Sequence, residues 1–201
     1  MKLNFYCVFI SLLICCSRPI EAQQDKNLNL SIDVDSIKSF AKKEQKVVAI
    51  RISNDTLCIV STNKALYYPF GSYSNFADYY SKSLQNSEYE YAIDSAFNLF
   101  KIIKVHSENS ELEFIENNET NKLELLTGHI SDDSFCLFNG IKIGMNRTDL
   151  LLKFFTHTPI EIMDKPVIEL KSGVDGVWYY FNFSKETLNK IDIETDYILS
   201  K

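Results

Sequence analysis

The chain has 201 residues, of which 45% are hydrophobic, and 27 acidic residues outnumber 21 Lys and Arg to give a net charge of −6 at pH 7. This length and apolar content suffice for one sizeable core or two small linked ones. An acidic chain without a basic cluster has nothing to neutralise phosphates, which argues against nucleic acids and anionic membrane surfaces as partners.

Residues 1–22 have the pattern of a secretory signal peptide. Lys2 is basic, the apolar run from Phe5 to Cys16 is too short to span a bilayer as a helix, and Ala22 offers a small residue at the cleavage point. An alternative is a loose lipobox in which Cys16 carries a lipid. Both alternatives predict an exported protein that is periplasmic or anchored to the outer membrane, with no membrane contact beyond an N-terminal lipid.

The next part of the chain predicts a helix followed by a β-hairpin. Residues 33–46 are expected to be helical, because Asp33 or Asp35 can cap a helix there and lysines gather at its end. The runs VVAIRIS and DTLCIVS, residues 47–53 and 55–61, are strand-like and lie on either side of Asn54-Asp55. The run ALYYPF, residues 65–70, is expected to stay extended, because Pro69 disfavours a helix.

A second helix and an antiparallel meander are expected in the middle of the chain. Ser74 or Asn75 can cap a helix whose face carries Phe76 and Tyr80. Three strand-like runs follow, and polar turns separate them. The runs are AFNLFKIIKVH (96–106), SELEFIE (110–116) and KLELLTGHI (122–130).

The last third predicts a strand-to-helix joint and three more strands. Gly144 ends an extended run, and Asn146 is a good N-cap for a helix from 146 to 155 that places Asp149 in its first turn. The strand-like runs KPVIELKS, GVWYYFNFS and TLNKIDIET follow, at residues 165–172, 176–184 and 187–195. Alternation in the second run predicts that Tyr179 and Phe181 face the core while Trp178 and Tyr180 face away from it.

These elements predict an α+β fold in which one or two antiparallel sheets carry short helices on one face. Residues 23–134 and 135–201 are expected to form an N-terminal α+β module and a C-terminal helix-plus-three-strand module, or together one continuous domain. Because an extended piece, a helix and three strands occur in each half, the order of elements also allows a degenerate tandem duplication.

The stretches IKIGMNRTDLLLKFF, VWYYFNF and LNKIDIE resemble the SmpA/OmlA (BamE-like) small outer-membrane lipoproteins and related modules of β-lactamase-inhibitor proteins. Gly144, Met145, Leu150 and the strand from Trp178 to Tyr180 match that pattern. His157-Thr158-Pro159 departs from it, because the family has Gly-x-Pro there. The resemblance covers the last third of the chain and implies a helix-on-sheet module that binds other envelope proteins, without catalytic residues.

Few residues suggest chemistry. The three histidines have no metal-ligand spacing, so neither a metal nor a cofactor is expected. Cys58 and Cys136 could form a disulfide in an oxidising compartment or remain two separate thiols. The acidic pair in SDDS, residues 131–134, could bind Ca²⁺ or serve as acid and base, but a solvated turn between two strands is the preferred interpretation.

The aromatic residues carry the functional prediction. Paired tyrosines in strands would put one ring on each side of a sheet, so the candidates for partner contact are Trp178, Tyr180, Tyr67 and Tyr68. The sequence therefore predicts a non-enzymatic protein-binding or scaffold module of the bacterial cell envelope. One alternative is an inhibitor or immunity protein that blocks an enzyme or toxin, and another is an envelope hydrolase acting on glycan or peptide.

Overall fold

The computed structural model describes residues 34–83, 88–93, 101–117, 120–173 and 176–196. The predicted signal peptide, its cleavage point at Ala22 and the lipidation candidate Cys16 lie outside these ranges. All of the described residues belong to one compact unit. Within the described part of the chain, no helix is long and apolar enough to span a membrane.

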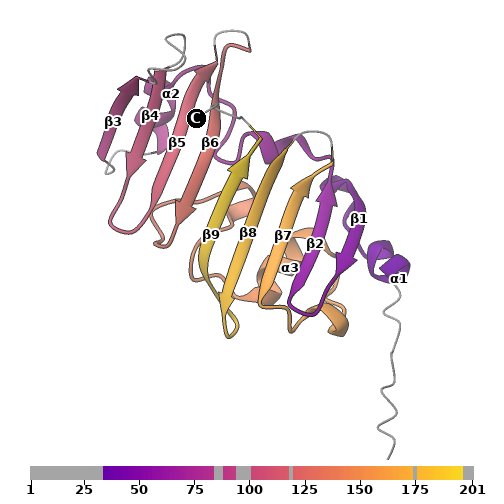
Figure 1. The fold of residues 1–201 in the computed structure, drawn as a ribbon. Helices are drawn as coiled ribbons and strands as arrows, with labels where there is room; N and C mark the ends of the chain where they lie inside the picture. The colour runs from indigo at the N-terminus through magenta and orange to yellow at the C-terminus, as the bar shows by residue number, and fades with distance from the viewer. Residues whose placement is uncertain (1–33, 84–87, 94–100, 118–119, 174–175, 197–201) are drawn as a thin grey trace, which may run out of the picture. The chain divides into compact units, whose positions relative to one another are not determined.

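The fold is mainly β, with one nine-stranded mixed sheet and a few short helices (Figure 1). The strand order is β1-β2-β7-β8-β9-β6-β5-β4-β3. The strands are β1 (Val47–Ile52), β2 (Thr56–Ser61), β3 (Glu88–Ile93), β4 (Lys101–His106), β5 (Glu111–Asn117), β6 (Lys122–Ile130), β7 (Val167–Ser172), β8 (Val177–Ser184) and β9 (Thr187–Thr195). The helices are α1 (Val34–Ser39), α2 (Phe76–Ser83) and α3 (Arg147–Phe154), with 3-10 turns η1 (Lys43–Gln45), η2 (Lys64–Tyr67), η3 (Phe138–Gly140) and η4 (Ile160–Ile162).

The sheet interleaves strands from both predicted modules. The hairpin β1-β2 lies on one side of β7, β8 and β9, and the meander from β3 to β6 lies on the other side. Each pairing is antiparallel except that between β2 and β7, which is parallel. The expectation of purely antiparallel sheets is therefore wrong at this one pair, because β7 joins the edge of β2 only after a long connection that includes α2, the meander and α3.

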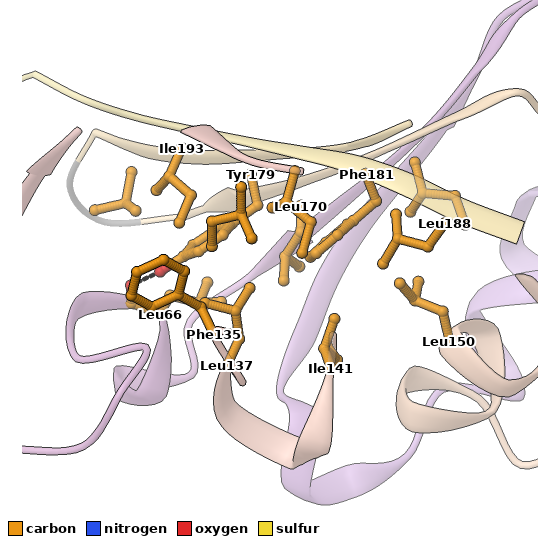
Figure 2. Close-up of a cluster of buried hydrophobic side chains, with 14 of the residues drawn as sticks. Leu66, Phe135, Leu137, Ile141, Leu150, Leu170, Tyr179, Phe181, Leu188 and Ile193 are labelled. Carbon is orange, nitrogen blue, oxygen red and sulfur yellow. Dashed lines mark hydrogen bonds between the residues drawn. The ribbon is translucent and has the colours of Figure 1, made fainter. Parts of the chain in front are cut away.

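Helices α2 and α3 contribute to the core on one face of the sheet. Phe76 and Tyr79 from α2, and Leu150 and Phe154 from α3, are buried in the same cluster as the inward side chains of the strands. Figure 2 shows the central part of this cluster, where Leu150 lies near Leu188 and where Phe135, Leu137 and Ile141 come from the segment before α3. The Tyr179 hydroxyl donates a hydrogen bond to the Leu66 carbonyl, so the phenol is satisfied within the core.

The strand-to-helix joint at Gly144 is structural. The Asn146 side chain accepts the Thr148 N–H at 2.9 Å and caps α3 as predicted. Arg147 is 5% exposed, and its guanidinium donates to the carbonyls of Met163 and Lys185, so it ties the start of α3 to the turn between β8 and β9. Gly144 has φ of +87°, a conformation that a glycine adopts without strain.

Two sequence predictions fail near the N-terminus. The helix expected over 33–46 is divided into α1 and η1, because the Lys42 N–H donates to the Phe154 carbonyl at 2.8 Å and Phe40 accepts the Thr156 N–H. The run predicted to be extended around Tyr67 instead forms the 3-10 turn η2, in which the Asn63 side chain accepts the Ala65 N–H. Pro69 follows this turn and therefore removes no hydrogen bond from it.

Candidate functional site

The face of the sheet opposite α2 and α3 is called the open face here. Residues that are directly opposite each other on neighbouring strands share a face, so the register identifies its side chains. One row of such partners crosses all nine strands, and a second row runs beside it. The first row is Glu88, His106, Glu111, His129, Asp192, Tyr180, Glu169, Cys58 and Arg51. The second includes Glu90, Lys104, Glu113, Thr127, Glu194, Trp178 and Lys171.

Strand β8 divides its aromatic residues between the two faces as predicted. Val177, Tyr179, Phe181 and Phe183 are buried, whereas Trp178, Tyr180 and Asn182 are half-buried on the open face. In β9, Ile193 and Ile191 lie directly opposite Tyr179 and Phe181 and are buried as well. Trp178 and Tyr180 therefore lie side by side along one strand with part of each ring accessible.

A shallow hollow of about 850 Å³ lies on the open face between β5 and β7. Its lining includes Tyr180 and four carboxylates but only one ammonium group. The charged lining residues are Glu111, Glu113, Asp192, Glu194 and Lys190, and the imidazole of His129 also faces the hollow. Some of the carboxylates have local partners, since Lys104 Nζ lies 2.7 Å from Glu113 and Lys190 Nζ lies 3.0 Å from Asp192. The hollow is acidic nonetheless.

The aromatic side chains next to the hollow have polar or charged neighbours. Lys171 Nζ lies 5.0 Å from the centroid of the Trp178 ring, within the range of a cation–π contact. Burial raises the pKa of the Tyr180 phenol, and the carboxylates of Glu194 and Glu169 raise it further, so the ring keeps its hydroxyl proton at neutral pH. Tyr180 thus offers an apolar ring with an intact hydroxyl, which suits it to contact another protein.

His129 connects a hydroxyl to a carboxylate at the edge of the hollow. Its Nδ1 lies 2.9 Å from Asp192 Oδ1, and its Nε2 lies 3.0 Å from Ser131 Oγ. Asp192 is also held by Lys190, and Asn182 Nδ2 lies 3.4 Å from its second oxygen. His106, in the same row, lies between Glu90 and Glu111 at 3.7 Å from each, too far for hydrogen bonds.

Asp132, from the SDDS stretch, holds the loop after β6 against the turn between β4 and β5. Its carboxylate accepts hydrogen bonds from the hydroxyls of Ser107 and Ser110 at 2.6 and 2.7 Å, and from the N–H groups of Asn109 and Ser134. Burial alone would raise the pKa of Asp132, but these four bonds outweigh it and hold the pKa below its usual range. The role of Asp132 is therefore to fix this loop.

Cys58 and Cys136 are free thiols in the structure, so the disulfide considered from the sequence is not formed between them. Cys58 belongs to the first row on the open face, whereas Cys136 lies in the segment that covers the other face. Burial and the neighbouring Glu169 raise the pKa of the Cys58 thiol to about 11, which leaves it protonated and unreactive at neutral pH.

Tyr67 and Tyr68 do not join Trp178 and Tyr180, because they lie in and after η2 rather than in a strand. The Tyr67 ring packs on the core and its hydroxyl is hydrogen-bonded to Ser172. Tyr68 lines a separate hollow of about 500 Å³ that also includes Pro69 and Cys136. The alternation expected of a strand therefore does not apply to these two tyrosines.

The sequence prediction missed His129, Ser131 and Asp192. The alternation of β9 already placed Asp192 on its polar side, but the partner strand was unknown, and 63 residues separate it from His129. In the described ranges, no group of three or more His, Cys, Asp or Glu side chains could hold a metal ion.

Comparison with known proteins identifies no relative. No family model matches the chain, and neither a curated protein nor a solved structure shows significant similarity to it.

Proposed function

We propose that this chain is an exported protein-binding module of the bacterial cell envelope that contacts its partner through the open face. The observation that carries this proposal is the alternation of β8, which leaves Trp178 and Tyr180 partly accessible on the face that α2 and α3 do not cover. Tyr and Trp contribute large contact areas with few rotatable bonds, and they are enriched at the centres of interfaces.

The charge of the hollow indicates the chemistry of the partner. Four carboxylates line it beside Tyr180, with Lys190 as the one ammonium group in the lining. A partner surface that brings Lys or Arg side chains to the hollow and an apolar patch to Trp178 would complement both features. Such complementarity speeds association and weakens as salt screens the charges.

Affinity purification of the tagged chain from its native cells tests the proposal. Wild type should retain a partner that Trp178→Ala and Tyr180→Ala lose. Ile160→Ala is a control, because Ile160 is 79% exposed on η4 and is not among the residues that line the hollow. The partner should then bind the purified chain directly, with an affinity that falls as salt rises. Equal retention by wild type and Trp178→Ala would refute binding through the open face.

An inhibitor or immunity protein would use the same surface. If the captured partner is an enzyme or a toxin, adding the purified chain to it should abolish its activity, and Trp178→Ala should restore that activity. A partner whose activity is unchanged at saturation would be scaffolded rather than inhibited.

A second candidate function, an envelope hydrolase acting on glycan or peptide, is favoured by the pair of His129 and Asp192 at 2.9 Å in the hollow. A positioned imidazole is the commonest general base in enzymes. The backbone N–H groups of Ser131 and Asp132 both donate to Ser110 Oγ, however, so they are not available to stabilise an oxyanion beside Ser131. For this reason, binding remains the first proposal.

A further inference from the structure

The bonds of His129 define the tautomer of its ring. The Asp192 carboxylate can only accept a hydrogen bond, so the imidazole Nδ1, at 2.9 Å from it, carries a proton. In the neutral ring, Nε2 is then an acceptor, and the Ser131 hydroxyl at 3.0 Å donates to it. This Ser131–His129–Asp192 relay is the arrangement in which an imidazole can remove the proton of a hydroxyl.

The surrounding structure holds all three residues in place. The register of β6 and β9 puts His129 directly opposite Asp192. Ser131 follows His129 by two residues, and its backbone N–H donates to Ser110 Oγ at 3.0 Å. The Ser110 hydroxyl is in turn bonded to Asp132. Lys190 holds the second oxygen of Asp192 at 3.0 Å. The relay is therefore fixed before any ligand arrives, as a catalytic group needs to be.

We propose that Ser131 is a base-activated hydroxyl that accepts an acyl group from an ester. Ser131 Oγ would attack the ester carbonyl carbon while its proton passes to His129 Nε2. The bond to the leaving oxygen then breaks, the leaving alcohol takes that proton, and an acyl ester remains on Ser131. Water, activated by the same imidazole, would later attack this ester, release the acid and restore the Ser131 hydroxyl. Asp192 stabilises the imidazolium but gives up no proton.

The environment of the relay limits which esters can react. The nearby backbone N–H groups are bonded to Ser110, so little stabilisation is offered to the tetrahedral oxyanion. Esters with a good leaving group, such as aryl esters, are therefore expected to react and simple alkyl esters are not. The carboxylates lining the hollow favour a neutral or cationic donor over an anionic one.

The test uses p-nitrophenyl acetate, a neutral aryl ester, with the folded chain. Release of p-nitrophenolate is followed by absorbance, and the acetylated residue is located by tandem mass spectrometry. Wild type should be acetylated at Ser131. His129→Gln should lower the rate of Ser131 acetylation by about 10²-fold or more, the usual contribution of a general base. Asp192→Asn should lower it as well, because the wrong tautomer is then allowed.

Two references separate the relay from ordinary surface reactivity. Ser184→Ala removes an exposed hydroxyl at the end of β8 and should leave the rate at Ser131 unchanged. Wild type in concentrated urea should lose the site-specific reaction, because unfolding separates His129 from Asp192. Failure to find acetyl on Ser131, or an equal rate in His129→Gln, would overturn the proposal. Neither outcome bears on binding through Trp178, which is measured separately by capture of the partner.

Discussion

Because Phe181 and Trp178 lie on opposite faces of β8, replacing each with alanine should have opposite consequences for stability and for binding. Phe181 is fully buried, and its ring stacks on that of Tyr179 with centroids 6.1 Å apart. Phe181→Ala removes most of this side chain and leaves a cavity between β8 and the core, which costs about 3–5 kcal/mol for a buried Phe. This loss is a large fraction of the stability of an ordinary domain, which is about 5–15 kcal/mol.

Trp178→Ala should cost much less stability, although Trp is the larger residue. Part of the Trp178 ring is already accessible to solvent, and its cation–π contact with Lys171 contributes about 0.5–1 kcal/mol at an exposed site. Adding a partial loss of apolar burial, we expect a total of about 1–2 kcal/mol. This substitution should instead abolish binding of the partner.

Urea-induced unfolding followed by far-ultraviolet circular dichroism measures both effects. The slope against urea should be the same in wild type and both variants, so the shift of the midpoint reports the change in the free energy of unfolding. A larger loss for Trp178→Ala than for Phe181→Ala would refute the assignment of the two faces, because a slip of one residue exchanges every side chain of a strand between them.

Two further substitutions test how the sheet and its loop are held. Asp132→Asn should cost about 2 kcal/mol near neutral pH, because hydrogen bonds to a charged acceptor are weakened. Since folding lowers the pKa of Asp132, its contribution to the free energy of unfolding is present above the unfolded pKa and is lost as the pH falls through the folded pKa. If wild type and variant differ in stability by the same amount at every pH of an acid titration, this role of Asp132 is contradicted. Gly128→Ala should lower the free energy of unfolding by about 1–3 kcal/mol, because the new Cβ would lie 2.8 Å from a methyl carbon of the buried Leu112. Thermal or urea unfolding measures this loss, and unchanged stability would show that the Leu112 side chain moves aside freely.

The sequence by itself determined the elements whose signals are local. Asn54-Asp55 predicted the hairpin of β1 and β2, and Asn146 predicted the start of α3. The alternation of β8 predicted which of its side chains are buried, because successive residues of a strand point to opposite faces wherever the strand lies. These predictions hold because hydrogen bonds and apolar faces within a few residues decide them.

The tertiary structure alone decided which strands are neighbours and which distant side chains meet. A strand offers hydrogen bonds on both edges and nothing local names its partner, so the parallel pairing of β2 with β7 was not foreseen. The predicted first helix is interrupted because residues near Ala41 pair with residues near Phe155. For the same reason, His129 reaches Asp192 only once β6 is placed beside β9. The acidic hollow and the relay of Ser131 follow from that placement.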